Sequence, residues 1–262
     1  GKKVSGSDMA ESEVTKALQD VGVVVYVGDA PDNLPKDCEL VIYSIAIPKD
    51  HPELVEAKKR GISVISYPEA LGIISKEKYT IAITGTHGKT TTTAMIAKIL
   101  MDAGLDPSVI VGSFLNDTKT NFVAGKSKYL VVEGCEYRRS FLNLHPSILV
   151  ITNIDADHLD YYNDLDDVKS AFAELTAKLP KDGILIDTFS DISLPADFKL
   201  KIPGKHNLEN AKAALAVACA LKISEKSALQ SLSEFSGTWR RFEYRGKAQN
   251  GALVYDDYGH HP

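Results

Sequence analysis

A glycine-rich turn is the first part of this sequence whose residue types could do chemistry. It reads GTHGKTT, from Gly85 to Thr91 (Gly85, Thr86, His87, Gly88, Lys89, Thr90, Thr91), between the apolar run TIAIT and a helical pattern. A strand, a tight turn and a helix in this order aim backbone N–H groups and a helix N-terminus at one point, which suits phosphate. Lys89 would add a positive charge for the outer phosphates, and the Thr90 hydroxyl is a suitable Mg²⁺ ligand. We predict a nucleotide site with a short loop, because Ile83 stands where the pattern G-x-x-x-x-G-K-[ST] has glycine; the alternative is a glycine turn with an ordinary surface lysine.

Two further apolar runs also end in polar residues. The run YLVVE ends at Glu133, and SILVIT leads into NIDADHLD, which contains His158. Ligands of open parallel sheets bind beyond the carboxyl ends of the strands. If the three runs are parallel neighbours, Thr90, Glu133 and His158 lie at one edge and could hold a divalent metal ion. A single acidic residue is ordinarily a solvated loop carboxylate, so the prediction rests on the agreement of three strand ends.

Three other segments carry candidate binding residues. Asn207 and Asn210 begin an Ala-rich helical pattern, where they could bind adenine, although Asn207 could equally be a helix N-cap. Arg240 and Arg241 could clamp a phosphate or carboxylate, and a solvated basic turn is the alternative. The early segment VSGSD places Ser5, Ser7 and Asp8 at a strand end, where a Rossmann-like unit binds ribose or base.

The elements that must position these residues alternate between strand-like runs and helical patterns, so we predict an α/β fold. Residues 1–76 form a Rossmann-like domain with helices at 11–20 and 52–60, and residues 77–250 form a central ATP-binding domain of the P-loop type. Residues 251–262 form a hinge. In the central domain we expect strands at 80–84, 129–133, 147–154, 183–187 and 198–202, and helices at 89–103, 165–179, 208–221 and 225–235.

Composition narrows the class of protein. The 262 residues carry a net charge of −5, which gives no electrostatic reason to expect nucleic acid or a membrane as partner. The longest apolar runs are strand-sized. Three widely spaced cysteines lack metal-ligand spacing and fit reduced thiols in the cytoplasm.

Both ends of the sequence look truncated. We expect a first strand and helix before Gly1 and a covering domain after Pro262.

Taken together, these segments resemble the Mur ligases, the ATP-dependent enzymes that build the peptide of peptidoglycan. The resemblance is carried, in the family's order, by GTHGKTTTT, NIDADHLDYY, GKHNLENAKAALAVA, WRRFE and DDYGHHP, and it spans nearly the whole chain. VSGSD and DDYGHHP are most similar to the branch that adds alanine. The family has three domains, and the chain would cover most of the first and all of the second.

The resemblance implies an amide-bond ligase that joins L-alanine to UDP-N-acetylmuramate through an acyl phosphate, with ATP and Mg²⁺. Lys89 would hold the β- and γ-phosphates; Thr90, Glu133 and His158 would bind metal. Asn207 and Asn210 would lie near adenine, with Arg240 or Arg241 on phosphate and Asp256, Asp257 and His260 at the ribose or in closure. Ser5, Ser7 and Asp8 would face uridine, Ser44 and Ala46 would line the sugar-nucleotide groove, and His87 would also contact this substrate.

Two positions depart from the family or from its sister branches. Cys135 replaces the middle carboxylate of an acidic segment, which leaves Glu133 as the expected metal ligand, and Phe172 stands where sister ligases carry a carbamylated lysine. Three alternatives stay open: a recycling ligase that adds a tripeptide to the same sugar nucleotide, a folylpolyglutamate synthase type, and a non-catalytic ATP-binding module. Residues 1–262 alone are expected not to ligate, and the oligomeric state is not predicted.

Overall fold

The computed structural model describes residues 2–187, 189 and 191–259, and their contacts divide the chain into two units. Unit 1 is Gly1–Leu71 and unit 2 is Gly72–Pro262, so the division falls inside α3 (Tyr67–Lys76). The sequence-based boundary after residue 76 lies at the end of that helix. No helix of the described residues has the length and apolar character needed to cross a bilayer.

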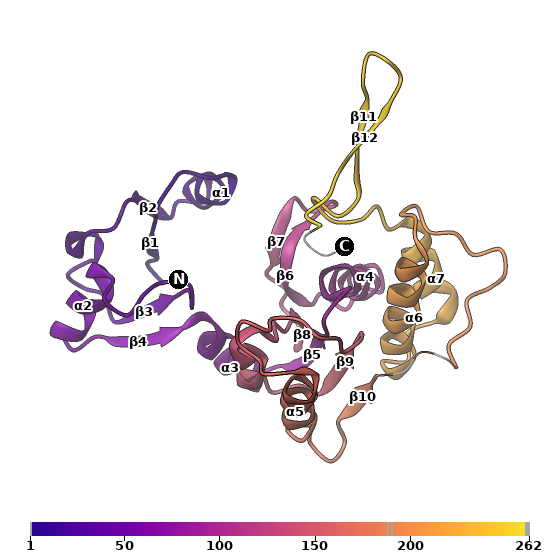
Figure 1. Ribbon diagram of the computed structural model, residues 1–262, viewed down its shortest axis with the longest axis horizontal. Coiled ribbons are helices and arrows are strands. Elements are labelled where there is room, and N and C mark those ends of the chain that lie inside the picture. Colours follow the sequence, from indigo (N-terminus) through magenta and orange to yellow (C-terminus); the bar gives the residue numbers. More distant parts are fainter. Residues whose placement is uncertain (1, 188, 190, 260–262) are drawn as a thin grey trace. The chain divides into compact units, whose positions relative to one another are not determined.

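Unit 1 contains two separate pairs of parallel strands. Strand β1 (Ser5–Asp8) pairs with β2 (Val24–Val27), and β3 (Leu40–Tyr43) pairs with β4 (Ser63–Ser66). The connections are α1 (Glu13–Asp20), the short 3-10 helix η1 (Pro31–Asn33) and α2 (Pro52–Lys59), as Figure 1 shows. Both predicted helices are therefore present. They begin where the sequence offers a start: a capping box between Ser12 and Thr15 for α1, and Pro52 in the first turn of α2.

Unit 2 is built on a six-stranded sheet with the order β10-β9-β5-β8-β6-β7. The central strands are β5 (Tyr79–Thr84), β8 (Tyr129–Glu133) and β9 (Ile148–Ile151), with β10 (Ile184–Ile186) at one edge. Both β8 and β9 pair with β5 in parallel, which confirms the predicted arrangement of the three strand ends. The sequence analysis missed β6 (Ser108–Leu115) and β7 (Thr120–Val123), which is the antiparallel strand of the sheet.

One face of this sheet is covered by α4 (Lys89–Asp102), and α4 is packed in turn against α6 (Lys205–Ala220) and α7 (Glu225–Glu234). Figure 1 shows these three helices beside one another and α5 (Leu165–Thr176) apart from them. Helix α5 instead contacts η2 (Tyr137–Asn143). Helix α4 is buried on several sides, and its small and apolar side chains allow close packing against the Ala-rich α6. The core therefore lies between the sheet and these helices, directly behind the glycine-rich loop.

Two predictions for unit 2 need correction. Residues 198–202 do not form a strand, although the alternation was informative: Phe198, Leu200 and Ile202 all pack on the core. The chain also forms an unpredicted antiparallel hairpin from β11 (Glu243–Lys247) and β12 (Leu253–Asp256), and the second strand lies within the predicted hinge at residues 251–262. A strand ladder needs a partner as well as an alternating face, and residues 198–202 have none within the described part of the chain.

Candidate functional site: a nucleotide and metal cleft

The glycine-rich loop is held in shape by two glycines and by the end of β9. Gly85 and Gly88 have φ values of 132° and 82°, and a Cβ on Gly85 would lie 2.1 Å from Thr152 Oγ1. The His87 N–H donates to Asn153 Oδ1 at 2.9 Å, and the Asn153 side-chain amide donates back to the His87 carbonyl at 2.9 Å. The loop conformation is thus fixed by residues that follow a neighbouring strand.

Helix α4 begins at this loop without a side-chain cap among the described residues, since Gly88 is its N-cap. The N–H groups of the first turn are the groups that a phosphate accepts from in other proteins. The loop opens onto a cleft of about 520 Å³. Most of the predicted nucleotide and metal residues line this cleft: Thr86, His87, Gly88, Lys89, Thr90, Thr91, Glu133, His158, Asn207, Asn210, Arg241 and Asp257.

The Lys89 ammonium is folded back onto its own loop. Its Nζ donates to the carbonyl oxygens of Gly85 at 2.6 Å and Thr86 at 2.9 Å, and to Glu136 Oε1 at 2.9 Å. The Lys89 side chain is 15% exposed and that of Glu136 only 3%. The pair is therefore a nearly desolvated, hydrogen-bonded ion pair at the floor of the cleft.

Thr90 and Glu133 form the second polar contact of the cleft. The Thr90 hydroxyl donates to Glu133 Oε1 at 3.0 Å, and the backbone N–H of Gly112 in β6 donates to Glu133 Oε2 at 2.7 Å. The β6–β8 ladder reaches Ile110, so Gly112 is beyond the paired residues and its N–H is available to the carboxylate. This holds Glu133 beside Thr90, as the metal prediction requires.

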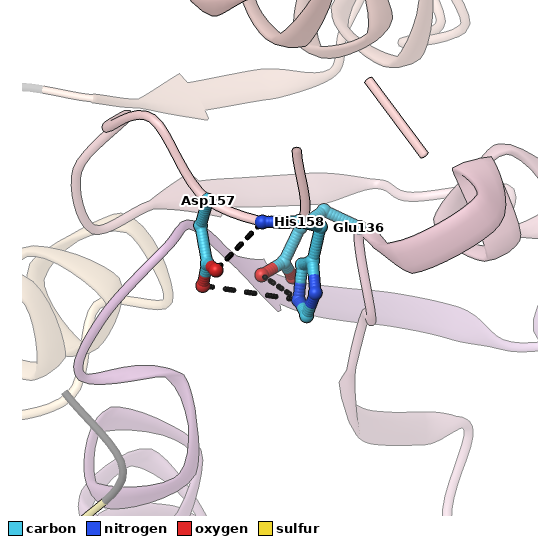
Figure 2. Close-up of side chains that lie close together, drawn as sticks. All are labelled: Glu136, Asp157 and His158. Carbon is cyan, nitrogen blue, oxygen red and sulfur yellow. Dashed lines mark hydrogen bonds and ion pairs between the residues drawn. The ribbon is translucent and has the colours of Figure 1, made fainter. Parts of the chain in front are cut away.

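His158 lies with a different pair of carboxylates. Its Nε2 is 3.5 Å from Glu136 Oε1 and 3.8 Å from Asp157 Oδ2. Figure 2 shows the Glu136 and Asp157 carboxylates turned toward the His158 ring; Glu136 follows β8, and the other two follow β9. Among the described residues these three form the group of His, Cys, Asp or Glu side chains that could hold a metal ion, with ligand atoms within 4.8 Å of one another.

The metal prediction therefore needs an addition. Glu136 and Asp157 were not among the predicted ligands, whereas Glu133 is not part of the three-residue group. The signal in the sequence was the number of carboxylates after the two strands, but their side-chain directions depend on the loops. Glu136 also fits a cation for a physical reason: it is 2% exposed, and its Oε2 has no hydrogen-bond partner among the described residues. Oxygen and imidazole ligands of this kind are compatible with Mg²⁺ or Mn²⁺.

Two groups around Glu136 have shifted pKa values. Desolvation raises the pKa of the Cys135 thiol, and the adjacent Glu136 carboxylate raises it further, so the thiol stays protonated. Burial also raises the pKa of Tyr162 to about 12, and its hydroxyl donates to the Glu136 carbonyl oxygen at 2.6 Å. Tyr162 therefore holds the backbone at Glu136, and neither neighbour adds negative charge to the cleft.

Of the two asparagines of α6, Asn210 lies against the phosphate loop, and Asn207 is hydrogen-bonded to Asn210. Asn210 Nδ2 donates to Asn207 Oδ1 at 3.2 Å, and Asn207 Nδ2 donates to the Pro203 carbonyl at 2.6 Å. A Cβ on Gly88 would lie 2.4 Å from Asn210 Oδ1. Asn207 is inside the helix, which begins three residues before the predicted start, so the N-cap alternative is wrong and Gly204 occupies that position.

The segment before the hairpin brings one of the two arginines into the cleft. Arg241 lines it, with Nη2 3.5 Å from Thr90 Oγ1, whereas Arg240 does not line it and pairs instead with Asp256 at 3.4 Å. Asp257 is in the cleft wall, where its Oδ2 accepts from the Phe242 N–H at 2.6 Å. The predicted ligand His260 lies outside the described residues.

Unit 1 has a cavity of its own, of about 440 Å³, between the β1–β2 and β3–β4 pairs. Ser5, Ser7, Asp8 and Ser44 line it as predicted, but Ala46 does not. Ser7 is already engaged, since its hydroxyl donates to Glu53 Oε2 at 2.8 Å. All four residues of β1 and of β3 line the cavity, so it runs along the full length of both strands.

Comparison with known protein families agrees with both units. Residues 1–79 match the description Mur ligase family, catalytic domain, and residues 83–194 match the Mur ligase middle domain. A Clostridium acetobutylicum protein named UDP-N-acetylmuramate–L-alanine ligase is 41% identical over 307 residues, covering 100% of this chain and 67% of that protein. A Caldicellulosiruptor saccharolyticus protein of the same name is 41% identical over 308 residues, with the same two coverages. The chain thus spans about two thirds of the length of these curated relatives.

Solved structures give the same result for the fold. The UDP-N-acetylmuramate–alanine ligase MurC of Thermotoga maritima superimposes with a TM-score of 0.87 at 29% identity, over 98% of this chain and 69% of that one. A murein peptide ligase of Psychrobacter arcticus gives a TM-score of 0.81 at 25% identity, over 99% and 68%. With two family matches, relatives at 41% identity and the same α/β fold, the chain belongs to the Mur ligase family.

Proposed function

We propose that this chain supplies the sugar-nucleotide and ATP-binding parts of a ligase that joins L-alanine to UDP-N-acetylmuramate in peptidoglycan precursor synthesis. The observation that carries the proposal is the single cleft that combines a phosphate loop, the Thr90–Glu133 pair and the Glu136–Asp157–His158 group. The names of the relatives at 41% identity specify the reaction. We place it in the cytoplasm, where the free thiols of Cys38, Cys135 and Cys219 would stay reduced.

Each side chain of the cleft has a role that follows from its charge and position. Lys89 and the N-terminus of α4 would bind and orient the phosphates of ATP, together with Arg241, which lies beside Thr90. Thr90, Glu133, Glu136, Asp157 and His158 would hold Mg²⁺, which neutralises phosphate charge when it is bound. Asn210 lies against Gly88 of the loop and is hydrogen-bonded to Asn207, and any adenine contact would come from the same helix end.

The reaction that these roles support is transfer of the γ-phosphoryl group to the muramyl carboxylate. The acyl phosphate formed in this way is then attacked by the amine of L-alanine, and phosphate leaves. Positioning and charge stabilisation are the contributions that the cleft can make to both steps. Ser5, Asp8 and Ser44 in unit 1 are the candidates for contacts to UDP-N-acetylmuramate, and His87 is the candidate in unit 2.

The test is a phosphate-release assay with the full-length protein, ATP, Mg²⁺ and UDP-N-acetylmuramate. Addition of L-alanine is expected to start turnover, whereas glycine or the intact tripeptide is expected to be much less effective. Preferential use of the tripeptide would assign the protein to recycling ligases instead. No turnover with any amine, combined with normal ATP binding, would indicate a non-catalytic nucleotide-binding module.

A second arm of the test concerns the phosphate loop and the length of the chain. Calorimetry of ATP with Mg²⁺ is expected to show at least tenfold weaker binding to Lys89→Ala than to the wild type. Equal affinities would remove Lys89 from the phosphate site. Residues 1–262 alone are expected to bind ATP weakly and not to ligate, because about one third of the relative's length lies outside the part that the chain covers. Ligation by residues 1–262 would contradict this expectation.

A further inference from the structure

The Lys89 ammonium has no donor left for a phosphate. An ammonium group has three N–H donors, and Lys89 directs them at the Gly85 carbonyl, the Thr86 carbonyl and the Glu136 carboxylate. A phosphate that is to be held by Lys89 must therefore displace one of these acceptors. The nucleotide-free arrangement and the nucleotide-bound arrangement of this lysine are mutually exclusive.

Glu136 is the acceptor that a phosphate would displace. The two carbonyl groups belong to the loop itself and stay beside Lys89 wherever the loop goes. Glu136 comes from a different element, and its negative charge would repel an incoming phosphate that approaches Lys89. Nucleotide binding therefore requires the Lys89–Glu136 ion pair, with its 2.9 Å contact, to separate or to be shared.

Separation leaves Glu136 in an unfavourable position. Glu136 is 2% exposed, its Oε2 has no hydrogen-bond partner among the described residues, and its Oε1 would lose the ammonium. A buried carboxylate without a counter-charge is costly, so separation alone opposes nucleotide binding. Something positive must replace Lys89 beside Glu136.

The side chains around Glu136 could hold a cation that takes the place of the Lys89 ammonium. His158 Nε2 and an Asp157 carboxylate oxygen lie close enough to Glu136 for one cation to contact all three, since their ligand atoms fall within 4.8 Å. A divalent cation there would restore the charge that Lys89 withdraws, and it would use the unpartnered Oε2.

We propose that Glu136 is exchanged between Lys89 and a divalent cation, so that nucleotide binding and metal binding are coupled through this one carboxylate. Without ligands, Glu136 holds Lys89 against the loop; with cation and nucleotide, the cation takes Glu136 and Lys89 turns to the phosphates. This inference rests on the proposed ATP site and adds to it a reason why ATP without metal binds poorly. Glu136 acts here as a positioning residue for Lys89.

In the first measurement, calorimetry gives the affinity of the full-length protein for ATP in the presence of EDTA. Glu136→Gln is expected to bind metal-free ATP at least tenfold more tightly than the wild type, since Lys89 is released and no buried charge is left behind. The matched control is Glu174→Gln, which removes the same charge from a carboxylate that pairs with Arg139 and does not line the cleft. It is expected to change the affinity less than threefold.

In the second measurement, the electron paramagnetic resonance signal of the free ion gives the affinity of the full-length protein for Mn²⁺ without nucleotide. Lys89→Met is expected to bind Mn²⁺ at least tenfold more tightly than the wild type, because the cation no longer competes with the ammonium for Glu136. This arm also covers the case in which Glu136→Gln does not fold. Unchanged affinities in either arm, with folded protein, would overturn the exchange.

The two proposals fail in different ways. If the wild type does not bind ATP even with Mn²⁺ present, the proposed function is wrong, and the proposed exchange of Glu136 between Lys89 and the cation is wrong as well. If the wild type binds ATP with Mn²⁺, but Glu136→Gln binds metal-free ATP no better than the Glu174→Gln control, the proposed function stands and the exchange alone is refuted.

Discussion

Replacing Gly112 by alanine would disturb Glu133 without touching any residue of the phosphate loop. Gly112 does not have a left-handed φ, so alanine can adopt its backbone conformation. The new Cβ would lie 2.8 Å from Glu133 Oε2 and 3.0 Å from Oε1, which is too close for either atom to stay in place. The two oxygens are at the free end of a flexible side chain that borders the cleft, so the carboxylate can move away at little cost.

The expected effect on affinity follows from the contact that is lost. The bond from the Gly112 N–H to Glu133 is charge-assisted, and such bonds contribute about 1.5–3 kcal/mol. Because every 1.4 kcal/mol is a factor of ten, ATP with Mg²⁺ should bind roughly tenfold to hundredfold more weakly. The contact borders solvent, which favours the lower end of this range. The free energy of unfolding should fall by at most about the same 1.5–3 kcal/mol, because the bond is also lost in the free protein and no backbone atom is among the three nearest neighbours of the new Cβ.

The assay combines calorimetry of ATP and Mg²⁺ with urea unfolding of the same full-length variant. Gly6→Ala is the matched control, because a Cβ on Gly6 would meet nothing within 4 Å and Gly6 lies in unit 1. It should leave ATP affinity unchanged. If Gly112→Ala binds ATP and Mg²⁺ within twofold of the wild type, Glu133 is not held in a way that matters for the metal. A loss of stability well above about 3 kcal/mol, which is more than the lost bond accounts for, would instead mean that the carboxylate cannot move aside.

Three further predictions concern the core, pH and the loop. Phe172→Ala should lower the free energy of unfolding in urea by about 3–5 kcal/mol, since Phe172 is 1% exposed and packs edge-to-face on Phe141 at 5.1 Å; a loss below 1 kcal/mol would contradict this. Because burial raises the pKa of Tyr162 to about 12 from an unfolded value of about 10, its contribution to stability should be complete below pH 10 and disappear as the pH rises toward 12. Tyr162→Phe should therefore flatten the pH dependence of urea unfolding in that window, and an unchanged profile would refute the assignment. Gly85→Ala should abolish ATP binding in calorimetry, because φ is 132° and the Cβ would meet Thr152 Oγ1 at 2.1 Å; normal affinity would show that the loop tolerates another shape.

The features that the sequence predicted well are those encoded locally. The run TIAIT, the glycines and the helical pattern after Lys89 are consecutive, so strand, loop and α4 follow from one segment. The parallel arrangement of β5, β8 and β9 was also predictable, because each strand is a continuous apolar run of the kind that is buried on both faces. Val168, Phe172 and Leu175 are spaced three or four residues apart and form the buried face of α5, which is likewise a local pattern.

The features that were missed depend on contacts between distant segments. Strand β6 contains Gly112 and pairs with β7 in antiparallel fashion, and nothing local distinguishes it from a loop with some apolar residues. The separation of Glu133 from the group around His158 depends on side-chain directions that the turns after β8 and β9 set. His158 itself has φ of 54°, a conformation that a residue-type pattern does not predict.

The contact between Gly88 and Asn210 limits how this sequence can drift during evolution. The two positions are far apart in the chain, yet a side chain at 88 would collide with Asn210 Oδ1 at 2.4 Å. A smaller residue at position 210 would remove that collision but leave the φ of 82° at position 88, which still favours glycine. The residue at position 210 can therefore change while Gly88 is kept. No change at position 210 alone allows a residue other than glycine at position 88 without strain. Variation at these two sites among homologues should show this asymmetry, with glycine retained at the first site in sequences that have lost asparagine at the second.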